Sequence, residues 1–331
     1  MKKLHLSCIV STIVIYSMLL NGCGTAYPPT ATAQAVAQVL ETRVQVPTPV
    51  SPTQTVEKPT VTLTDTLQPA TEQPTASPTP DTRLLPDRWM EWPVVPVVSE
   101  NAKKIYQKGL EMGTNPRAFS KVGDCQNVRD FFLGPLDDPR QYRLGKRYEY
   151  LKPTIDYYAG VWSRTSLAVK GGFNVASVLS PMMADPKACQ PNETPLLCEL
   201  RLNNPSIVVI SMETWWAKRP ADLYGSYLRQ ILDIVIQHGA VPILGTKADN
   251  LEGDNSINSM IAQIAYDYDI PLWNFWAAAH ALPDGGLQPD GFHLTVGFNY
   301  YDDKLALRLG WPVRNLTALQ AIDAVRLAVA G

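Results

Sequence analysis

The sequence predicts an α/β fold, a three-layer α/β/α sandwich with a central parallel sheet of about five strands. The run from Ile207 to Met212 is apolar except at Ser211, which is typical of a strand buried on both faces of a parallel sheet. The residues after it change to helical spacing, with apolar side chains recurring from Leu223 to Val235. Strands and helices that alternate at these lengths favour a doubly wound domain.

The first elements of this domain follow from local signals. Ser99 can cap a helix that runs through Met112, and Gly113 is expected to end it. Residues 117–122 then form a predicted first strand. Gly123 at its end is expected to allow the tight backbone of a turn that delivers the next residues toward a helix.

The later elements repeat the same alternation. The helix over residues 223–235 is expected to end at Gly239. The remaining predicted elements are a strand over 240–245, a helix over 257–268 and a short last strand over 271–274. An apolar, glycine-containing stretch over 168–175 lies between the first two long strands in the chain.

Three segments divide the chain. Residues 1–22 carry Lys2 and Lys3, then an apolar run too short for a comfortable membrane span, and resemble a bacterial lipoprotein signal. The residues Leu20-Asn21-Gly22-Cys23 resemble its lipobox, which implies that Cys23 becomes the lipidated first residue of the mature protein. A simple secretory signal and an uncleaved anchor are the alternatives. The protein is therefore expected outside the cytoplasm, bound to the membrane through its lipid.

Residues 23–85 are rich in Pro and Thr and nearly free of aromatic residues. Such a composition buries too little apolar surface to offset the entropy of ordering, so a disordered linker is expected. About 60 residues span roughly 190 Å as polyproline, at about 3.1 Å each. Residues 86–331 then form one domain, expected to be a monomer.

The net charge indicates which partners are excluded, and the cysteines indicate which thiols are paired. A net charge of -2 with 18% charged residues and no basic cluster argues against a nucleic-acid partner. In an exported protein, Cys189 and Cys198 flank a short loop that a disulfide can close. Cys125 is then unpaired, so it is either buried and inert or kept for its reactivity.

Asp290 and His293 are three residues apart near the C-terminal end. An imidazole relays protons well when a carboxylate fixes its tautomer and stabilises its charged form. These two residues can therefore form the base half of a nucleophilic site, and Cys125 is the candidate nucleophile. Asp124, Cys125, Asp290 and His293 are also metal-ligand types, but nothing in their spacing requires a metal, and none is expected.

The region from Arg117 to Arg308 resembles the SGNH, or GDSL-type, hydrolase superfamily. Gly123-Asp124-Cys125 matches its first block except at the nucleophile, which is serine in the family. Asp290-x-x-His293 matches its last block. Gly171 or Gly172 is the candidate for the oxyanion glycine, and Trp215 falls where the family has its oxyanion asparagine.

This resemblance implies a flavodoxin-like arrangement and a hydrolase that acts on carbohydrate or lipid esters. Cys125 would attack the acyl carbon, His293 would act as general base and acid, and Asp290 would orient His293. No cofactor is implied. Because the nucleophile and the asparagine block both depart from the family, the alternative is an inactive pseudoenzyme that binds glycans of the cell envelope, with Trp215 and Trp216 in the old cleft.

Overall fold

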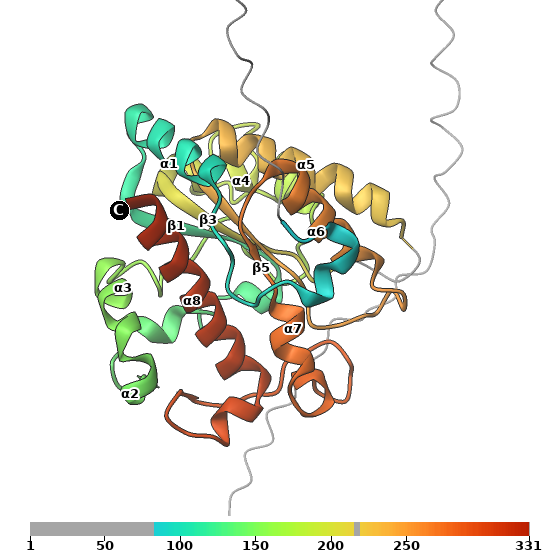
Figure 1. The fold of residues 1–331 in the computed structure, drawn as a ribbon. Coiled ribbons are helices and arrows are strands. Elements are labelled where there is room, and N and C mark those ends of the chain that lie inside the picture. Colours follow the sequence, from blue (N-terminus) through green and yellow to red (C-terminus); the bar gives the residue numbers. More distant parts are fainter. Residues whose placement is uncertain (1–82, 215–218, 331) are drawn as a thin grey trace, which may run out of the picture. The chain divides into compact units, whose positions relative to one another are not determined.

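The computed structural model describes residues 83–214 and 219–330 (Figure 1). The chain separates into two units, Met1–Ala76 and Ser77–Gly331, and the first lies wholly outside the described residues. The expected signal peptide, the lipidation site Cys23, nearly all of the linker, and both Trp215 and Trp216 also lie outside them. Within the described part, no helix has the length and apolar character needed to cross a membrane.

Four parallel strands form the central sheet, in the order β1 (Asn115–Gly123), β3 (Pro205–Ser211), β4 (Val241–Gly245) and β5 (Leu272–Trp273). All residues of β3 and β4 are buried, as their apolar runs predict. The prediction of about five strands is wrong by one for the described residues, because the stretch over 168–175 contributes only a parallel bridge from Val169 to Gly123. With that bridge counted, the order is the 2-1-3-4-5 of flavodoxin-like sheets.

Helices cover both faces of this sheet, which confirms the predicted α/β/α class (Figure 1). On one face, α1 (Glu100–Met112) packs against α8 (Gly310–Ala330) and contacts β3 and β4. On the other, α5 (Ala221–Gln237) packs against α4 (Pro195–Asn203) and α6 (Ser256–Tyr268). Right-handed crossovers between successive parallel strands bring α5 and α6 to the same face.

Shorter elements complete the described chain. The helices are α2 (Gly145–Tyr148), α3 (Lys152–Tyr157) and α7 (Phe275–His280), and a second parallel pair consists of β2 (Tyr142–Arg143) and β6 (Asn299–Tyr300). The 3-10 turns are η1 (Pro86–Glu91), η2 (Cys125–Asn127), η3 (Gly134–Asp137), η4 (Glu149–Leu151), η5 (Ser177–Leu179), η6 (Pro181–Met183), η7 (Pro283–Gly286) and η8 (Ala306–Arg308).

The predicted ends of helix α1 are confirmed. The Ser99 hydroxyl accepts a hydrogen bond from the Ala102 N–H at 3.1 Å, which satisfies one of the free donors of the first turn. Gly113 ends the helix in the left-handed region, with φ of 90°. Gly239 has the same role after α5, where its φ is 86°.

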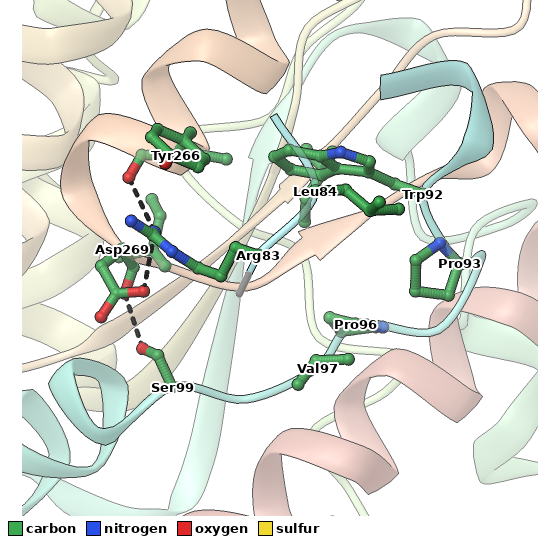
Figure 2. A pocket seen from close by; sticks show the side chains of 12 residues that line it. Arg83, Leu84, Trp92, Pro93, Pro96, Val97, Ser99, Tyr266 and Asp269 are labelled. Atoms are coloured by element: carbon green, nitrogen blue, oxygen red, sulfur yellow. Dashed lines mark hydrogen bonds and ion pairs between the residues drawn. The ribbon is translucent and has the colours of Figure 1, made fainter. Parts of the chain in front are cut away.

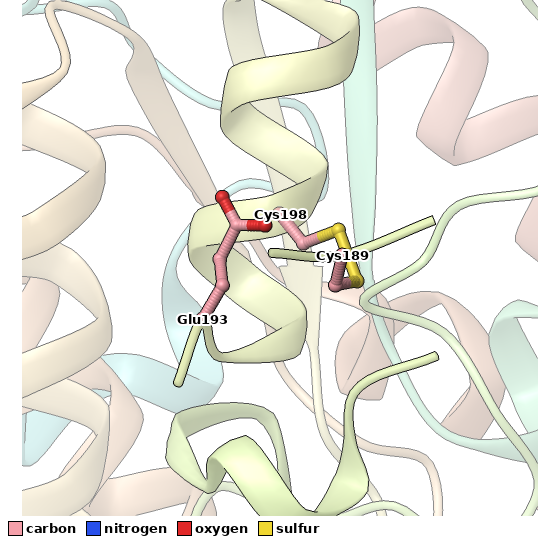
Figure 3. A group of neighbouring side chains, drawn as sticks. All are labelled: Cys189, Glu193 and Cys198. Carbon is pink, nitrogen blue, oxygen red and sulfur yellow. A yellow bond between two sulfur atoms is a disulfide. The ribbon is translucent and has the colours of Figure 1, made fainter. Parts of the chain in front are cut away.

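A disulfide joins Cys189 to Cys198 at the start of α4, with 5.3 Å between their Cα atoms (Figure 3). Glu193 lies close to the two sulfur atoms, and the three side chains together have the ligand types of a metal site. Both sulfurs are oxidised in the S–S bond, however, and a thiolate is what binds a metal. Arg201 pairs with the Glu193 carboxylate at 2.7 Å. This group is therefore a structural disulfide with a neighbouring ion pair.

Candidate functional site

The candidate site lies outside the carboxyl ends of β1 and β3, which pair with each other through Gly123 and Ser211. In the sheet, the Val169 bridge lies next to β1 on one side of this pair, and β4 lies next to β3 on the other side. A sheet that reverses its strand order in this way opens a crevice at the switch point. Asp124 and Cys125 follow β1 there, and Glu213 and Thr214 follow β3.

Asp124 is fully buried and connects the two sides of this switch point. One carboxylate oxygen accepts from the Gln126 N–H at 2.9 Å and so caps η2, and the other accepts from the Thr214 N–H at 2.5 Å. Burial, and after it the nearby Glu213 carboxylate, raise the pKa of Asp124 to about 7, although the bonds from Gln126 and Thr214 act in the opposite direction. The residue therefore holds the nucleophile turn and the loop after β3 in one arrangement.

Gly123 is required for a close approach, which corrects the expected reason for this glycine. Its φ is not positive, so the turn itself does not demand glycine. A Cβ at this position would lie 2.0 Å from the side-chain nitrogen of Asn127. That nitrogen donates to the Ser211 carbonyl at 2.8 Å, and the Asn127 oxygen accepts from the Ser211 hydroxyl at 3.0 Å. Asn127 thus joins the ends of β1 and β3.

A buried arginine on α8 joins the hydrogen-bond network of Asn127 and Ser211. Arg314 is 0% exposed, and its Nη2 donates to the Ser211 hydroxyl at 2.7 Å. The same nitrogen lies 2.7 Å from a Glu213 carboxylate oxygen in an ion pair without hydrogen-bond geometry. Its guanidinium also lies over the rings of Phe132, Trp273 and Phe275, at 4.9, 5.3 and 4.9 Å. Arg314 was not predicted, although it is the one charged residue of the largely apolar stretch 310–322, which is a visible signal.

Cys125 is a free, half-buried thiol at the start of η2. Burial raises its pKa to about 12, and the carboxylates of Asp124 and Glu213 add to the shift. The thiol is therefore protonated at neutral pH. Gly171 lies beside it, since a Cβ added at Gly171 would meet only the Cys125 Cβ, at 3.9 Å, whereas one at Gly172 would meet nothing within 4 Å.

Asp290 and His293 form the expected carboxylate–imidazole pair, with 2.6 Å between the carboxylate and Nδ1. The other Asp290 oxygen accepts from the N–H groups of Phe292 and His293, both at 3.0 Å. Burial alone would raise the pKa of Asp290, but the bond from His293 and these two backbone bonds outweigh it, so the pKa is lowered. Both side chains are about half exposed, and among the described residues the bond to Asp290 occupies only the Nδ1 atom of His293.

Gln126 brings this pair to the nucleophile turn, because its side-chain nitrogen donates to the Phe292 carbonyl at 2.9 Å. The turn that holds Cys125 and the loop that holds His293 are therefore directly joined. In the described residues no hydrogen bond connects the Cys125 thiol to His293 itself. Catalytic contacts are often long before a substrate binds, so this separation alone does not decide activity.

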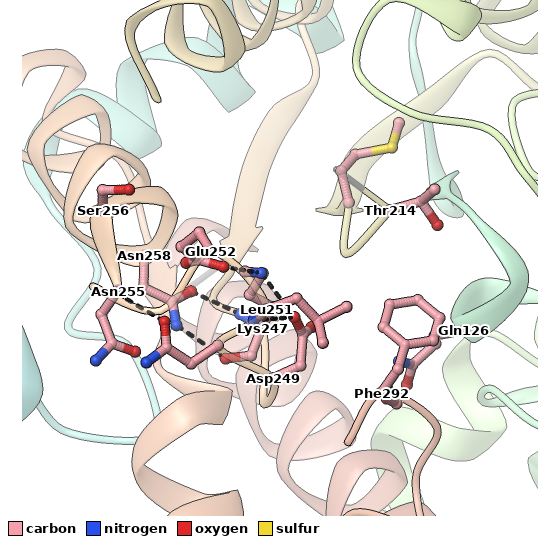
Figure 4. A network of polar contacts seen from close by, with 12 residues as sticks. Gln126, Thr214, Lys247, Asp249, Leu251, Glu252, Asn255, Ser256, Asn258 and Phe292 are labelled. Carbon is pink, nitrogen blue, oxygen red and sulfur yellow. Dashed lines mark hydrogen bonds and ion pairs between the residues drawn. The ribbon is translucent and has the colours of Figure 1, made fainter. Parts of the chain in front are cut away.

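A second buried polar cluster follows β4 and was not predicted. The Lys247 Nζ lies 2.7 Å from Asp249 and 2.6 Å from Glu252. The Asn258 side chain binds the Lys247 backbone through both its oxygen and its nitrogen. Figure 4 shows these residues together with Gln126, Thr214 and Phe292 of the candidate site. Burial lowers the pKa of Lys247, but the two carboxylates outweigh it and raise it, so this cation is internally neutralised.

The residues named as metal-ligand types do not gather around one point. Asp124 directs both oxygens at backbone N–H groups, and Asp290 is bound to His293. Over residues 83–214 and 219–330, the one cluster of three such side chains is the disulfide group at Cys189. Trp215, the expected replacement for the oxyanion asparagine, lies outside the described residues.

Comparisons with known proteins add little to this geometry. No family model and no curated protein matches the chain. One solved structure, the crystal structure of TesA, matches 61% of this chain and 97% of its own length, with 15% identity and a TM-score of 0.37. That score and identity are too low to transfer an activity or to assign a family.

Proposed function

We propose that the protein is an ester hydrolase of the SGNH type that uses Cys125 in place of serine. One observation carries the proposal: Gln126 joins the turn that holds a half-buried thiol to the loop that holds a preformed Asp290–His293 pair. The pair has an open imidazole nitrogen, and Gly171 lies beside the thiol with free space around it. Nucleophile, base, orienting carboxylate and a backbone donor for an oxyanion are the parts that acyl transfer requires.

The reaction follows from the protonation state of the thiol. Because the pKa of Cys125 is raised to about 12, the thiol loses its proton only as it attacks, and His293 Nε2 takes that proton. The Sγ–C bond forms, and the N–H groups of Cys125 and Gly171 hold the oxyanion. The leaving alkoxide departs with the proton from His293. Water, deprotonated by the same imidazole, then attacks the thioester carbonyl. The C–S bond breaks, the Cys125 sulfur takes the proton back from His293, and a carboxylic acid is released.

The substrate class and the location belong to the same proposal. We place the enzyme outside the cytoplasm, anchored to the membrane by a lipid on Cys23, with carbohydrate or lipid esters as substrates. The lipobox-like Leu20-Asn21-Gly22-Cys23 and the long Pro/Thr-rich stretch support this location. Labelling with a fatty-acid analogue tests it, since Cys23→Ala should lose the label and move the protein out of the membrane fraction.

A second candidate is a pseudoenzyme that binds envelope glycans. The raised pKa of the Cys125 thiol favours it. Two buried carboxylates beneath Cys125 oppose formation of a thiolate, and the thiol makes no hydrogen bond to the imidazole among the described residues. A site kept for catalysis by cysteine usually lowers the thiol pKa. If this candidate holds, the native protein turns over no ester and binds glycans unchanged after His293→Ala.

Hydrolysis of short-chain aryl esters separates the two candidates. The enzyme hypothesis predicts activity that disappears in both Cys125→Ala and His293→Ala and falls in Asp290→Asn. Cys125→Ser should retain or increase the activity, because the site operates with a protonated nucleophile and a general base, as serine requires. If the native protein and Cys125→Ser both match buffer, the hydrolase proposal fails for these esters.

A further inference from the structure

Three large apolar side chains are exposed close to the loop that carries His293. They are Phe131, Val296 and Phe298, which are 48%, 63% and 73% exposed, and the last two follow His293 within five residues. A single exposed apolar residue needs no explanation, but a group of them marks a surface that binds a partner. These three residues are called the apolar strip below.

The first turn of α8 brings Phe131 next to the segment that follows His293. The Phe131 ring stacks on the Trp311 ring, with 5.4 Å between their centroids. The Trp311 N–H donates to the Thr295 carbonyl at 3.1 Å, so Trp311 contacts both segments. Figure 1 shows the start of α8 at the end of this helix that is far from the C-terminus. The members of the strip therefore lie on one surface, although they are distant in the chain.

The packing of Gly297 keeps its two neighbours at the surface. A Cβ at Gly297 would lie 3.0 Å from a side-chain carbon of Pro312, so the backbone here lies close against the start of α8. Val296 and Phe298, on either side of Gly297, are both exposed. Their exposure thus follows from the way this loop packs on the domain.

The cation that contacts this surface is neutralised. The Phe298 ring stacks on the Tyr300 ring at 5.3 Å, and the Arg143 guanidinium lies 3.8 Å from the centre of the Tyr300 ring. Arg143 also pairs with the Asp302 carboxylate at 3.0 Å. A partner of the strip is therefore held by apolar contact rather than by charge.

The described chain begins at the opposite edge of the sheet. Arg83 donates to the Asp269 carboxylate at 2.9 Å, beside a pocket of about 380 Å³ (Figure 2). This pocket borders Leu272, the first residue of β5, and so lies at the amino-terminal edge of the parallel strands. Cys125 follows the carboxyl end of β1, at the other edge.

The length of chain before Arg83 allows the strip to face a membrane that holds the N-terminus. About 60 residues separate Cys23 from Arg83, and a chain of this length spans at most about 200 Å. A domain of about 245 residues is only about 45 Å across. A tether attached at one edge can therefore let the other edge turn to the bilayer, which stays at high effective concentration.

We propose that the apolar strip docks on a lipid bilayer and thereby selects esters of membrane lipids, rather than soluble carbohydrate esters, as substrates. The inference rests on the proposed hydrolase and names its substrate class. Because Val296 and Phe298 lie on the same loop as His293, a bilayer in contact with them presents its ester groups next to the imidazole. The docking itself requires no catalysis, so it can be tested separately.

Photolabelling from the lipid tests the docking. The full chain, anchored through its N-terminus, is reconstituted in phosphatidylcholine vesicles that contain a phospholipid with a diazirine in one acyl chain. After irradiation, peptide mass spectrometry should find lipid adducts on the peptide that carries Phe131. Their yield should fall about tenfold in Val296→Ser/Phe298→Ser, because burial of a Phe side chain changes a binding constant by at least this factor. The control Leu327→Ser, at an exposed leucine near the other end of α8, should leave it unchanged.

Two further variants separate docking from folding and from chemistry. Phe298→Leu keeps an apolar side chain and should retain the adducts, and Cys125→Ala should retain them because docking precedes catalysis. High salt should not reduce the yield, since the strip binds without charge. Adducts spread evenly over the domain, or a yield that the double serine variant does not change, would overturn the docking. A dimer that dissociates in this variant would assign the strip to a second copy and overturn it as well.

Two rates distinguish a failure of the docking from a failure of the hydrolase. Hydrolysis of a long-chain ester in vesicles is measured relative to hydrolysis of a soluble aryl ester. This ratio should fall about tenfold in Val296→Ser/Phe298→Ser and stay constant in Leu327→Ser; a constant ratio in both would overturn the substrate class. Adducts without hydrolysis of either ester would support the docking and overturn the hydrolase with its substrates. Hydrolysis of the soluble ester without adducts would overturn the docking alone.

Discussion

Cys125 carries the chemistry at the residue scale, and its surroundings keep it protonated. Burial opposes formation of a thiolate, and the nearby carboxylates of Asp124 and Glu213 disfavour a further negative charge there. A nucleophile in this state depends on a base that removes its proton during attack. His293 is the residue whose position allows it, because its Nδ1 is held by Asp290 and its Nε2 is open.

The first prediction concerns this protonation. Alkylation of Cys125 by iodoacetamide at pH 8 should be on the order of 100-fold slower in the native protein than in urea, because only the thiolate reacts and an ordinary thiol has a pKa near about 8.5. Peptide mass spectrometry measures both rates. Asp124→Asn should raise the native rate by removing one nearby negative charge. Equal native and unfolded rates would contradict the raised pKa.

The second prediction follows from the raised pKa of Asp124. The folded state holds this proton up to about pH 7, whereas the unfolded chain releases it near about pH 3.9, so the folded state binds more protons between these values. The contribution of Asp124 to the free energy of unfolding therefore decreases as the pH rises from about 4 to about 7. Urea unfolding at several pH values should show a smaller decline of the unfolding free energy in Asp124→Asn. An identical decline in both proteins would exclude this assignment.

At the scale of elements, the ends of β1 and β3 and the turn η2 act as one unit. Asn127 fills the space over Gly123 and binds both Ser211 groups, and Asp124 holds the Thr214 N–H. A change in any of these contacts moves the thiol relative to the loop after β3. The small size of residue 123 is what allows this packing.

The third prediction tests that packing. Gly123→Ala should destabilise the fold by about 1–3 kcal/mol, because the added methyl meets the Asn127 side chain and both must shift. Gly171→Ala is the matched control, since its methyl would meet only the Cys125 Cβ at ordinary van der Waals distance and should cost under about 0.5 kcal/mol. Denaturant unfolding gives both values. Similar costs for the two variants would show that Gly123 does not need its small size.

Prediction from sequence succeeded where local signals and buried strands decide the structure. The Ser99 cap, the Gly113 end and the buried runs of β3 and β4 are each encoded by a few adjacent residues. The fold class and the pairing of Asp290 with His293 follow from such short-range patterns. The role of Gly123 was misassigned because it depends on the Asn127 side chain, which is held over Gly123 by Ser211 of a strand distant in the chain. Arg314 and the Lys247 cluster were missed because buried charge pairs depend on tertiary contacts that spacing does not reveal.

In the whole molecule, helix α8 covers one face of the sheet and also contacts the candidate site, through Arg314. Arg314 extends from this helix to Ser211 and Glu213, which follow each other closely at the end of β3. The ion pair is fully buried, so each partner neutralises a charge that would otherwise lie in the core.

The fourth prediction concerns that ion pair. Arg314→Met should cost about 3–5 kcal/mol of unfolding free energy, because it leaves Glu213 charged and unpaired in the core. Adding Glu213→Gln should recover part of the loss. The exposed pair of Arg88 and Glu91 is the control, and Arg88→Met should cost at most about 0.5 kcal/mol. Chemical unfolding of the four proteins measures these differences, and a double variant as unstable as Arg314→Met would argue against a coupled pair.

The most direct test of the central claim is whether an acyl group forms on Cys125. The full chain is mixed with an aryl acetate, quenched in acid within seconds, and analysed by intact mass and peptide mapping. The account predicts one acetyl group on the Cys125 peptide, absent in Cys125→Ala, and formed much more slowly in His293→Ala or in urea. If the native protein acquires no such adduct, or acquires it as slowly as the unfolded chain, Cys125 is not a nucleophile activated by His293.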